Sequence, residues 1–274
     1  MKEVIQKICD ALKNTPYENH VYLVGGIVRD RILGRPAKDD VDMVLEGDSS
    51  ALASFLYNKH LAKHKPVVYP RFGTSMINVD DVTVEIVGAR KESYTSDTRK
   101  PETEPATLVD DIYRRDFTIN ALLENIHTGE ILDITGRGLS DISKGIIRTP
   151  SDPGKTFEDD PLRMMRAVRF AARFGFEIEN NTYDAICKSI DRLRIISKER
   201  IRDEFVKTII EPNASYAINI LRTSGLLNEF IPELAACYGI TQNGYHKHDV
   251  WTHSLLTMEY ISTGAGILLR LAAL

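Results

Sequence analysis

The stretch VYLVGGIVRDRILGRPAKDDVDMV, residues 21–44, decides the fold of this chain. It joins an apolar run, a glycine pair, a short amphipathic segment and two aspartates one residue apart. Side chains of a strand alternate between faces, so Asp40 and Asp42 project from one face while Val41 and Met43 pack behind them. Adjacent carboxylates repel each other unless a cation lies between them. Mg²⁺ is typically held by such ligands together with substrate phosphates.

The glycine pair stands between a predicted strand and a predicted helix. Gly25 and Gly26 lack a Cβ, so their backbone amides are open to a phosphate, and the start of the following helix adds further amides. A triphosphate cradle and a metal site would therefore lie within about 20 residues, less than one supersecondary unit.

The composition fits two domains with a substantial core, since 43% of the 274 residues are hydrophobic. No run of about 18 apolar residues occurs, so we expect no membrane span. The three cysteines are scattered without C-x-x-C spacing, which is typical of reduced residues in a cytoplasmic protein. A net charge of −4 argues against a generally basic nucleic-acid coat but permits local basic patches.

Residues 67–90 predict two strands that turn at residues 80–81. The second strand carries Glu85, the acid best placed to act as a third catalytic carboxylate beside Asp40 and Asp42 if the strands are neighbours. An edge-strand glutamate that faces water explains the pattern equally well.

Four other segments complete the first half of the chain. Residues 2–14 predict a helix with one apolar face, and residues 49–61 predict another helix capped by serine. Residues 91–109 are polar and proline-bearing and show no apolar period, so they predict a mobile loop. Residues 131–148 predict a last strand and a turn, and the first domain ends there.

The segment RRDFTINAL, residues 114–122, predicts a polar cluster at the start of a helix. Arg114 and Arg115 can each bind phosphate or ribose oxygens through two hydrogen bonds. Asp116 and Asn120 would share a helical face, where they can brace or read a ribose hydroxyl. A helix cap with satisfied surface charges is the alternative for any one of these residues.

The segment FEDDPLRMMRAVRFAARFGF, residues 157–176, predicts one helix with an apolar side. On a helical wheel the other side carries Asp159, Arg163, Arg166 and Arg173. A ladder of i,i+4 ion pairs, worth roughly 0.3 kcal/mol each, is the alternative. The lack of matching acids further along the segment weakens that alternative.

These motifs, in this order, resemble those of the class II tRNA nucleotidyltransferase and bacterial poly(A) polymerase family. The family motif E-D-x-x-R corresponds to Asp159, Asp160 and Arg163, with aspartate where the family often has glutamate. The resemblance implies an α+β fold class, in which a polymerase β-like nucleotidyltransferase head with a mixed sheet is followed by an all-helical neck and body. The implied domains are a head over residues 1–147, a neck and body over 148–238, and the beginning of an incomplete HD-like helical domain over 239–274.

The resemblance implies that Asp40 and Asp42 hold two Mg²⁺ ions. The residues that it implies for substrate binding are Gly25, Gly26, Arg29, Asp30, Arg115, Asp116, Asn120, Asp159, Asp160, Arg163 and Arg166. The chemistry of the last motif supports its role, because a carboxylate accepts from the exocyclic amine of cytosine or adenine while a guanidinium donates to the neighbouring ring nitrogen. Uracil and guanine present the opposite pattern and would be rejected by about 10⁴.

The implied function is addition of C and A to the 3′ end of tRNA from CTP and ATP, with the tRNA acceptor end as partner. In this family a loop at the place of residues 91–109 helps to switch nucleotide specificity, so its presence favours addition of the terminal A. A poly(A) polymerase, an A-only or CC-only enzyme, and a catalytically silent RNA-binding module are the alternatives.

Two features of the second half complete the resemblance. Arg200 and Glu204 correspond to family residues that brace the base-selecting helix. Residues 248–255, HDVWTHSL, resemble the first helix of an HD phosphohydrolase domain, with His253 as its first expected metal ligand. No later His-Asp pair follows, so we expect a packed histidine and no phosphohydrolase activity. The unfinished apolar run LLRLAAL indicates part of a longer protein.

Overall fold

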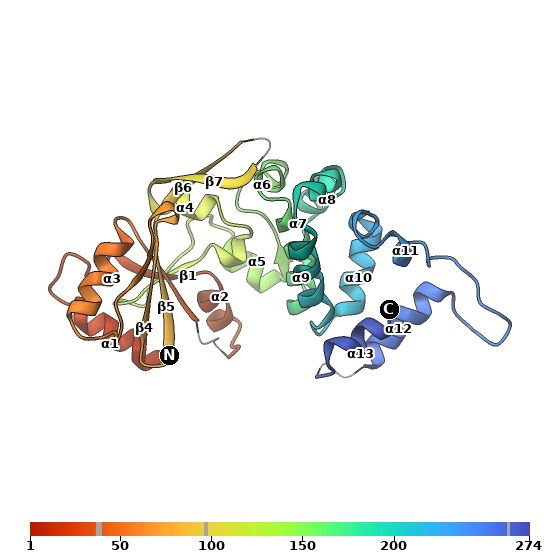
Figure 1. Cartoon of the computed structure of the whole chain (residues 1–274), viewed down its shortest axis with the longest axis horizontal. Coiled ribbons are helices and arrows are strands. Elements are labelled where there is room, and N and C mark those ends of the chain that lie inside the picture. The colour runs from red at the N-terminus through yellow and green to blue at the C-terminus, as the bar shows by residue number, and fades with distance from the viewer. Residues whose placement is uncertain (37–39, 96–97, 262–263) are drawn as a thin grey trace. The chain divides into compact units, whose positions relative to one another are not determined.

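The structure of the chain is a computed structural model that describes residues 1–36, 40–95, 98–261 and 264–274. The chain divides into two compact units (Figure 1). The first unit contains Met1–Thr95 and Lys100–Lys144, and the second consists mainly of Gly145–Leu274. The predicted α+β class is confirmed, because a mixed sheet dominates the first unit and helices dominate the second. The finer division at residues 147 and 238 stays a prediction.

A mixed sheet forms the centre of the first unit. Within the described residues it has seven strands in the order β3-β4-β5-β2-β1-β8-β9. The central pair, β2 and β5, is parallel, and each other neighbouring pair is antiparallel. The strands are β1 (Val21–Val24), β2 (Asp40–Leu45), β3 (Val67–Tyr69), β4 (Thr74–Val79), β5 (Val82–Gly88), β8 (Leu123–Asn125) and β9 (Ile131–Leu132).

Helices cover both faces of this sheet. The two predicted helices are present as α1 (Lys2–Leu12) and α3 (Ser49–Asn58), and α3 packs against β4 and β5. The predicted serine cap of α3 is wrong, because Asp48 caps this helix by accepting from the Ser50 amide. The other face contacts α2 (Gly26–Ile32) and α4 (Leu108–Tyr113). Alternation along β2 sends Val41 and Met43 into the core with no exposed surface, whereas Val44 packs with Ile112 of α4 on the opposite face. The acidic residues of β2 therefore share the α4 face of the sheet.

Two predictions for the first unit are wrong in secondary structure. We expect a loop over residues 91–109, but most of these residues belong to a two-stranded sheet of β6 (Arg90–Thr95) and β7 (Thr98–Pro105), next to the 3-10 turn η1 (Pro70–Phe72). Residues 131–148 contain α5 (Gly138–Lys144) in addition to a strand.

The second unit is mainly helical, as expected. It also contains one small parallel pair of strands, β10 (Ile146–Ile147) and β11 (Glu177–Ile178), which the all-helical prediction did not include. Helix α7 is central and packs against α9 and α10. Six of its apolar residues have no exposed surface: Met164, Met165, Ala167, Val168, Ala171 and Ala172. The helical elements are α6 (Pro153–Asp159), α7 (Leu162–Phe174), α8 (Asn180–Ser189), η3 (Ile190–Ile195), α9 (Lys198–Ile209), α10 (Ala214–Thr223), η4 (Leu226–Glu229), α11 (Pro232–Ala235), α12 (Val250–Tyr260) and α13 (Ile267–Ala272).

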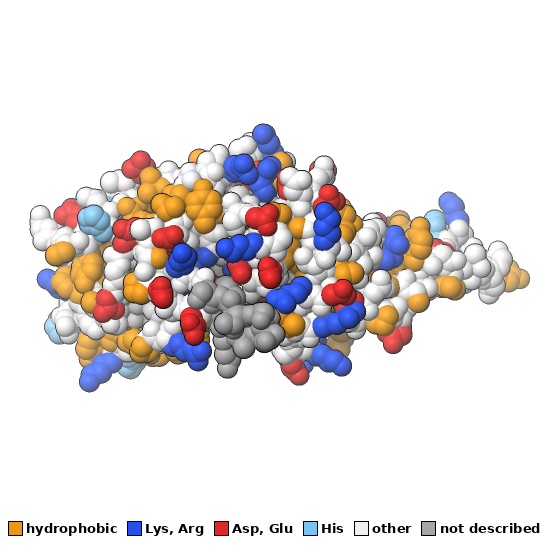
Figure 2. Space-filling view, turned by 90° about the horizontal axis from the view of Figure 1, so that it is seen from above, with side chains coloured by type: hydrophobic (Ala, Val, Ile, Leu, Met, Phe, Trp, Pro, Cys, Tyr) orange, Lys and Arg blue, Asp and Glu red, His pale blue; other side chains and the backbone are white. Residues whose placement is uncertain are grey.

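The surface carries charges of both signs. On the face shown in Figure 2, Lys and Arg side chains are interspersed with Asp and Glu, in keeping with the small net charge of −4. Among the helices that the structure describes, none combines the length and apolar character needed to cross a bilayer.

Candidate active site

Three carboxylates occupy the central parallel pair of strands. In the register of β2 and β5, Asp42 lies opposite Glu85, and Asp40 lies opposite Thr83. Asp42 and Glu85 are half-buried, and Asp40 is exposed. Because β5 lies between β4 and β2, Glu85 is not on an edge strand, and that alternative is wrong. The sheet therefore brings the third acid beside the predicted aspartate pair.

Burial and mutual repulsion raise the pKa values of two of these carboxylates. Burial raises the pKa of Asp42 above its ordinary value of 3.8, Arg115 opposes this shift, and Asp40 adds to it. Burial likewise raises the pKa of Glu85, followed by the charge of Asp42, while Arg90 acts in the opposite direction. A hard divalent cation would relieve this repulsion.

This donor set fits a metal that is only partly held by protein. Among the described residues, no group of three or more His, Cys, Asp or Glu side chains is arranged as a complete metal site. Mg²⁺ usually takes one or two carboxylates and completes its shell with water and substrate phosphate oxygens. Asp40 and Asp42, with Glu85 beside them, match that requirement.

Gly25 forms the corner next to these acids. Its φ of +75° lies in the left-handed region, which an L side chain rarely adopts, and it precedes the first residue of α2. A Cβ at this position would stand 3.8 Å from Nη1 of Arg115 and 3.9 Å from Oδ2 of Asp42. The absence of a side chain thus keeps open the space between a carboxylate and a guanidinium. The adjacent Gly26 begins α2.

A buried polar cluster lies behind this corner. Arg29 is 3% exposed, and its Nε donates to Oδ1 of Asp30 at 2.8 Å. Nη1 of Arg29 donates to Oδ1 of Asn120, and Nδ2 of Asn120 donates to Oδ1 of Asp116 at 3.0 Å. The predicted contact between Asp116 and Asn120 therefore exists. The predicted helix does not, because Asn120 ends the 3-10 turn η2 (Thr118–Asn120).

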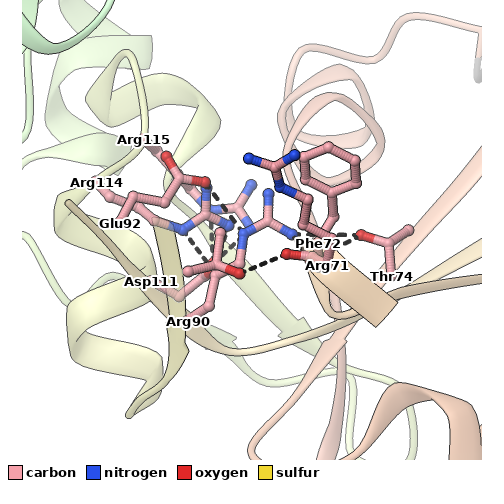
Figure 3. Close-up of polar contacts among 9 residues, drawn as sticks. Arg71, Phe72, Thr74, Arg90, Glu92, Asp111, Arg114 and Arg115 are labelled. Atoms are coloured by element: carbon pink, nitrogen blue, oxygen red, sulfur yellow. Dashed lines mark hydrogen bonds and ion pairs between the residues drawn. The ribbon is translucent and has the colours of Figure 1, made fainter. Parts of the chain in front are cut away.

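Two arginines follow the end of α4, where a helix start was expected. Both are bound by one carboxylate, that of Asp111, which has no exposed surface. Its Oδ1 accepts from Nε of Arg114 at 2.9 Å, and its Oδ2 accepts from Nη2 of Arg115 at 2.7 Å (Figure 3). Burial alone would raise the pKa of Asp111, but Arg115 and Arg114 outweigh burial and hold this pKa below its ordinary value.

The same cluster of side chains includes residues of β6. Oε1 of Glu92 accepts from Nη1 of Arg114 at 2.9 Å and from Nε of Arg90 at 3.1 Å. Figure 3 shows these side chains converging from β6 and α4. Asp111 and Glu92 were missed from the sequence. The signal for Asp111 was present, since an acid three and four residues before two arginines on a helix predicts such pairing.

The segment predicted to form one base-selecting helix forms two helices, α6 and α7. Asp159 is the last residue of α6, Asp160 follows in an extended conformation with φ −140°, and α7 begins at Leu162. Asp159 and Arg163 therefore do not lie on one helix, and the helical-wheel argument that joined them is wrong. Arg163 is 9% exposed. Asp160 remains close to Arg163, because its backbone carbonyl accepts from the Arg163 amide at 3.0 Å.

The arginines further along α7 make contacts of two kinds. Arg166 stacks over the ring of Phe170 at 5.3 Å. Arg169 is buried, and its Nε donates to Oε1 of Glu204 on α9, which is 4% exposed. Glu204 therefore braces α7 as expected, but through Arg169, a partner that the sequence did not indicate. The predicted partner residue Arg200 lies on the same helix, α9.

The histidine predicted to pack in the last part of the chain is exposed. His253 lies on α12, and its ring meets that of His246 edge to face at 5.8 Å. The helix begins after Asp249, whose Oδ1 accepts from the Thr252 amide at 2.8 Å. Asp249 therefore serves as the helix cap.

Residues 21–148 match the family profile of the poly A polymerase head domain, and residues 175–238 match that of the probable RNA and SrmB-binding site of polymerase A. The chain belongs to the poly(A) polymerase and tRNA nucleotidyltransferase family. It is similar to the CCA-adding enzyme of Leuconostoc mesenteroides, with 37% identity over 81% of this chain and 53% of the relative. It is also similar to the A-adding tRNA nucleotidyltransferase of Aquifex aeolicus, with 33% identity over 77% of this chain and 25% of the relative.

The fold agrees with this family membership. The solved structure of the Bacillus stearothermophilus CCA-adding enzyme in complex with CTP superposes with a TM-score of 0.72 at 32% identity, over 87% of this chain and 59% of that one. The chain spans about half the length of the curated relatives that match it, for example 46%, 53% and 47%.

Proposed function

We propose that this chain adds C and A to the 3′ end of tRNA, using CTP and ATP and releasing pyrophosphate. The observation that carries the proposal is the corner at Gly25, where the carboxylate of Asp42 and the guanidinium of Arg115 flank a position without a side chain. Relatives named as CCA-adding enzymes support the choice of reaction.

The metal chemistry is assigned to the acids of the central strands. Asp40 and Asp42 would hold two Mg²⁺ ions, with Glu85 as the third carboxylate. When bound, these ions would lower the pKa of the primer 3′-hydroxyl and neutralise the leaving pyrophosphate.

The chain's own residues position the nucleotide. Gly25 and Gly26 leave backbone amides open to the triphosphate, and Arg115 places a positive charge beside them. Asp116 and Asn120 read the ribose hydroxyls. Arg29 is buried, with its Nε on Asp30 and its Nη1 on Asn120, so we assign Arg29 and Asp30 to holding Asn120 and not to direct contact with phosphate.

Selection of the base is assigned to the second unit. Asp160 would accept from the exocyclic amine of cytosine or adenine, while Arg163 would donate to the neighbouring ring nitrogen. Asp159 and Arg166 would support this pair. A polar site of this kind discriminates strongly, because the wrong base leaves its buried groups unpaired. No template is needed.

The domain division at residues 147 and 238 and a cytoplasmic location complete the proposal. Three free cysteines support a reducing compartment. The relatives from Saccharomyces cerevisiae and Candida glabrata are named as mitochondrial, so fractionation of the native cells is the test of location.

The A-adding relative makes an A-only enzyme the second candidate. Three tRNA transcripts separate the candidates: one that ends before the first C of the CCA end, one that ends after it, and one that ends after the second C. Each transcript is incubated with one labelled nucleotide at a time. The proposal predicts two CMP on the first transcript, one CMP on the second and one AMP on the third. If only the third transcript gains AMP, the chain is an A-adding enzyme. A long A ladder would identify a poly(A) polymerase. Binding of tRNA without any product would identify a silent RNA-binding module.

A further inference from the structure

The starting point is the pairing of one buried carboxylate with two arginines at the end of α4. Each oxygen of Asp111 serves a different arginine. Oδ1 accepts from Nε and Nη2 of Arg114 at 2.9 and 2.5 Å. Oδ2 accepts from Nε and Nη2 of Arg115 at 3.2 and 2.7 Å. Charge-assisted bonds of this kind fix orientation as well as distance, because the guanidinium fork is rigid.

This pairing determines where the remaining nitrogen of Arg115 lies. With Nε and Nη2 on Asp111, Nη1 lies 3.8 Å from the place that a Cβ of Gly25 would take, and Oδ2 of Asp42 lies 3.9 Å from the same place. Arg115 therefore extends from a buried anchor to the open corner beside the catalytic acids.

The anchor is itself held from a second direction. Nη1 of Arg114 donates to Oε1 of Glu92 at 2.9 Å, and the side chain of Glu92 is 6% exposed. Glu92 also accepts from Nε of Arg90 at 3.1 Å. Nη1 of Arg90 in turn donates to the carbonyl of Phe72. As Figure 3 shows, a chain of alternating acids and arginines connects β6 with α4 and ends at Arg115.

We propose that Asp111 is a positioning residue that holds Arg115 in place for the triphosphate, and that Glu92 steadies this arrangement through Arg114. The proposal rests on the proposed function, because it gives Arg115 a phosphate to bind. Asp111 touches no reacting atom in this account, since it has no exposed surface and both of its oxygens are taken by arginines.

The test compares Asp111→Asn with Asp110→Asn in the whole chain. Asparagine has the shape of aspartate but loses one acceptor oxygen and the negative charge, so one arginine must lose its partner. Asp110 is the matched control, because it lies next to Asp111 on α4 and its role is to cap the helix with Thr107. Equilibrium binding of CTP and of CMP is measured for each variant.

For Asp111→Asn we expect CTP to bind about tenfold more weakly, the equivalent of one lost charge-assisted bond. CMP binding should stay within about twofold of wild type, because CMP lacks the distal phosphates. A merely structural role would weaken both ligands. In an Arg115→Gln background, Asp111→Asn should add no further loss of CTP affinity. A loss of the same size in both backgrounds would overturn the proposal.

A second variant keeps the proposal testable if Asp111→Asn does not fold. Glu92→Gln leaves Asp111 intact and should weaken CTP about threefold without changing CMP, a fraction of one hydrogen bond. Unchanged CTP binding by either folded variant would overturn the proposal. If wild type itself binds neither CTP nor CMP, the proposed function fails, which is a different result.

Discussion

Replacing Asp42 with asparagine should make the metal-free protein more stable while it abolishes nucleotide transfer. Asp42 is half-buried and lies opposite Glu85, and burial raises its pKa. The folded protein therefore disfavours the charged form. Removing this charge should therefore stabilise the folded protein, and each kcal/mol gained raises Tm by about 2–4 °C in a protein of this size.

The pH dependence gives the sign of this effect. A raised folded pKa means that the folded protein binds the proton more tightly than the unfolded chain, so the contribution of Asp42 to stability falls as pH rises. The Tm difference between Asp42→Asn and wild type should vanish below the ordinary value of 3.8. The Tm difference should grow as pH rises from 3.8 to the raised pKa of the folded protein, and it should stay constant at higher pH.

Thermal unfolding in EDTA from about pH 3 to 8 measures this difference, and CMP incorporation with Mg²⁺ measures the chemistry. Loss of several kcal/mol of metal-derived stabilisation should lower incorporation by on the order of 10³-fold. Asp81→Asn, at the exposed turn between β4 and β5, is the control and should change neither quantity. A lower Tm for Asp42→Asn at pH 8, or turnover within about tenfold of wild type, would refute the reasoning.

Three further substitutions test other parts of the site. Gly25→Ala should cost about 1–3 kcal/mol of unfolding free energy, because φ of +75° with ψ of −131° is a conformation suited to glycine, and should raise the KM for CTP in steady-state kinetics. Glu204→Ala should cost about 3–5 kcal/mol in urea unfolding, because it leaves the charge of Arg169 buried without its partner; Glu199→Ala, exposed on the same helix, should stay within about 0.5 kcal/mol. Arg163→Ala should reduce the preference for CTP over UTP by on the order of 10²-fold in kcat/KM, and an unchanged preference would remove Arg163 from base selection.

The acidic residues of the candidate site were predictable from the sequence because alternation along a strand is a local property. It placed Asp40 and Asp42 on one face, and the turn at residues 80–81 placed Glu85 on the following strand. Their register was not predictable, because β2 and β5 are far apart in the chain and pair in parallel. Only the fold could decide between a third carboxylate and a solvated glutamate.

The errors have physical causes that apolar periodicity does not reveal. The two-stranded sheet of β6 and β7 has no apolar alternation, and ion pairs of Arg90 and Glu92 help to hold its first strand. The break between α6 and α7 comes from Pro161, since a residue before proline avoids the helical conformation, and Asp160 is extended. The apolar period continues across that break, so it predicted one helix.

The central claim is that this chain builds a defined C-C-A end without a template. The most direct measurement incubates the 274-residue chain with a tRNA that lacks its CCA end, equimolar ATP, CTP, GTP and UTP, and Mg²⁺, and then sequences the 3′ ends of the products. The account predicts that most extended molecules end in C-C-A and grow no further. Extended A tracts, products that contain U or G in proportion to supply, or tRNA that is bound and never extended would contradict it.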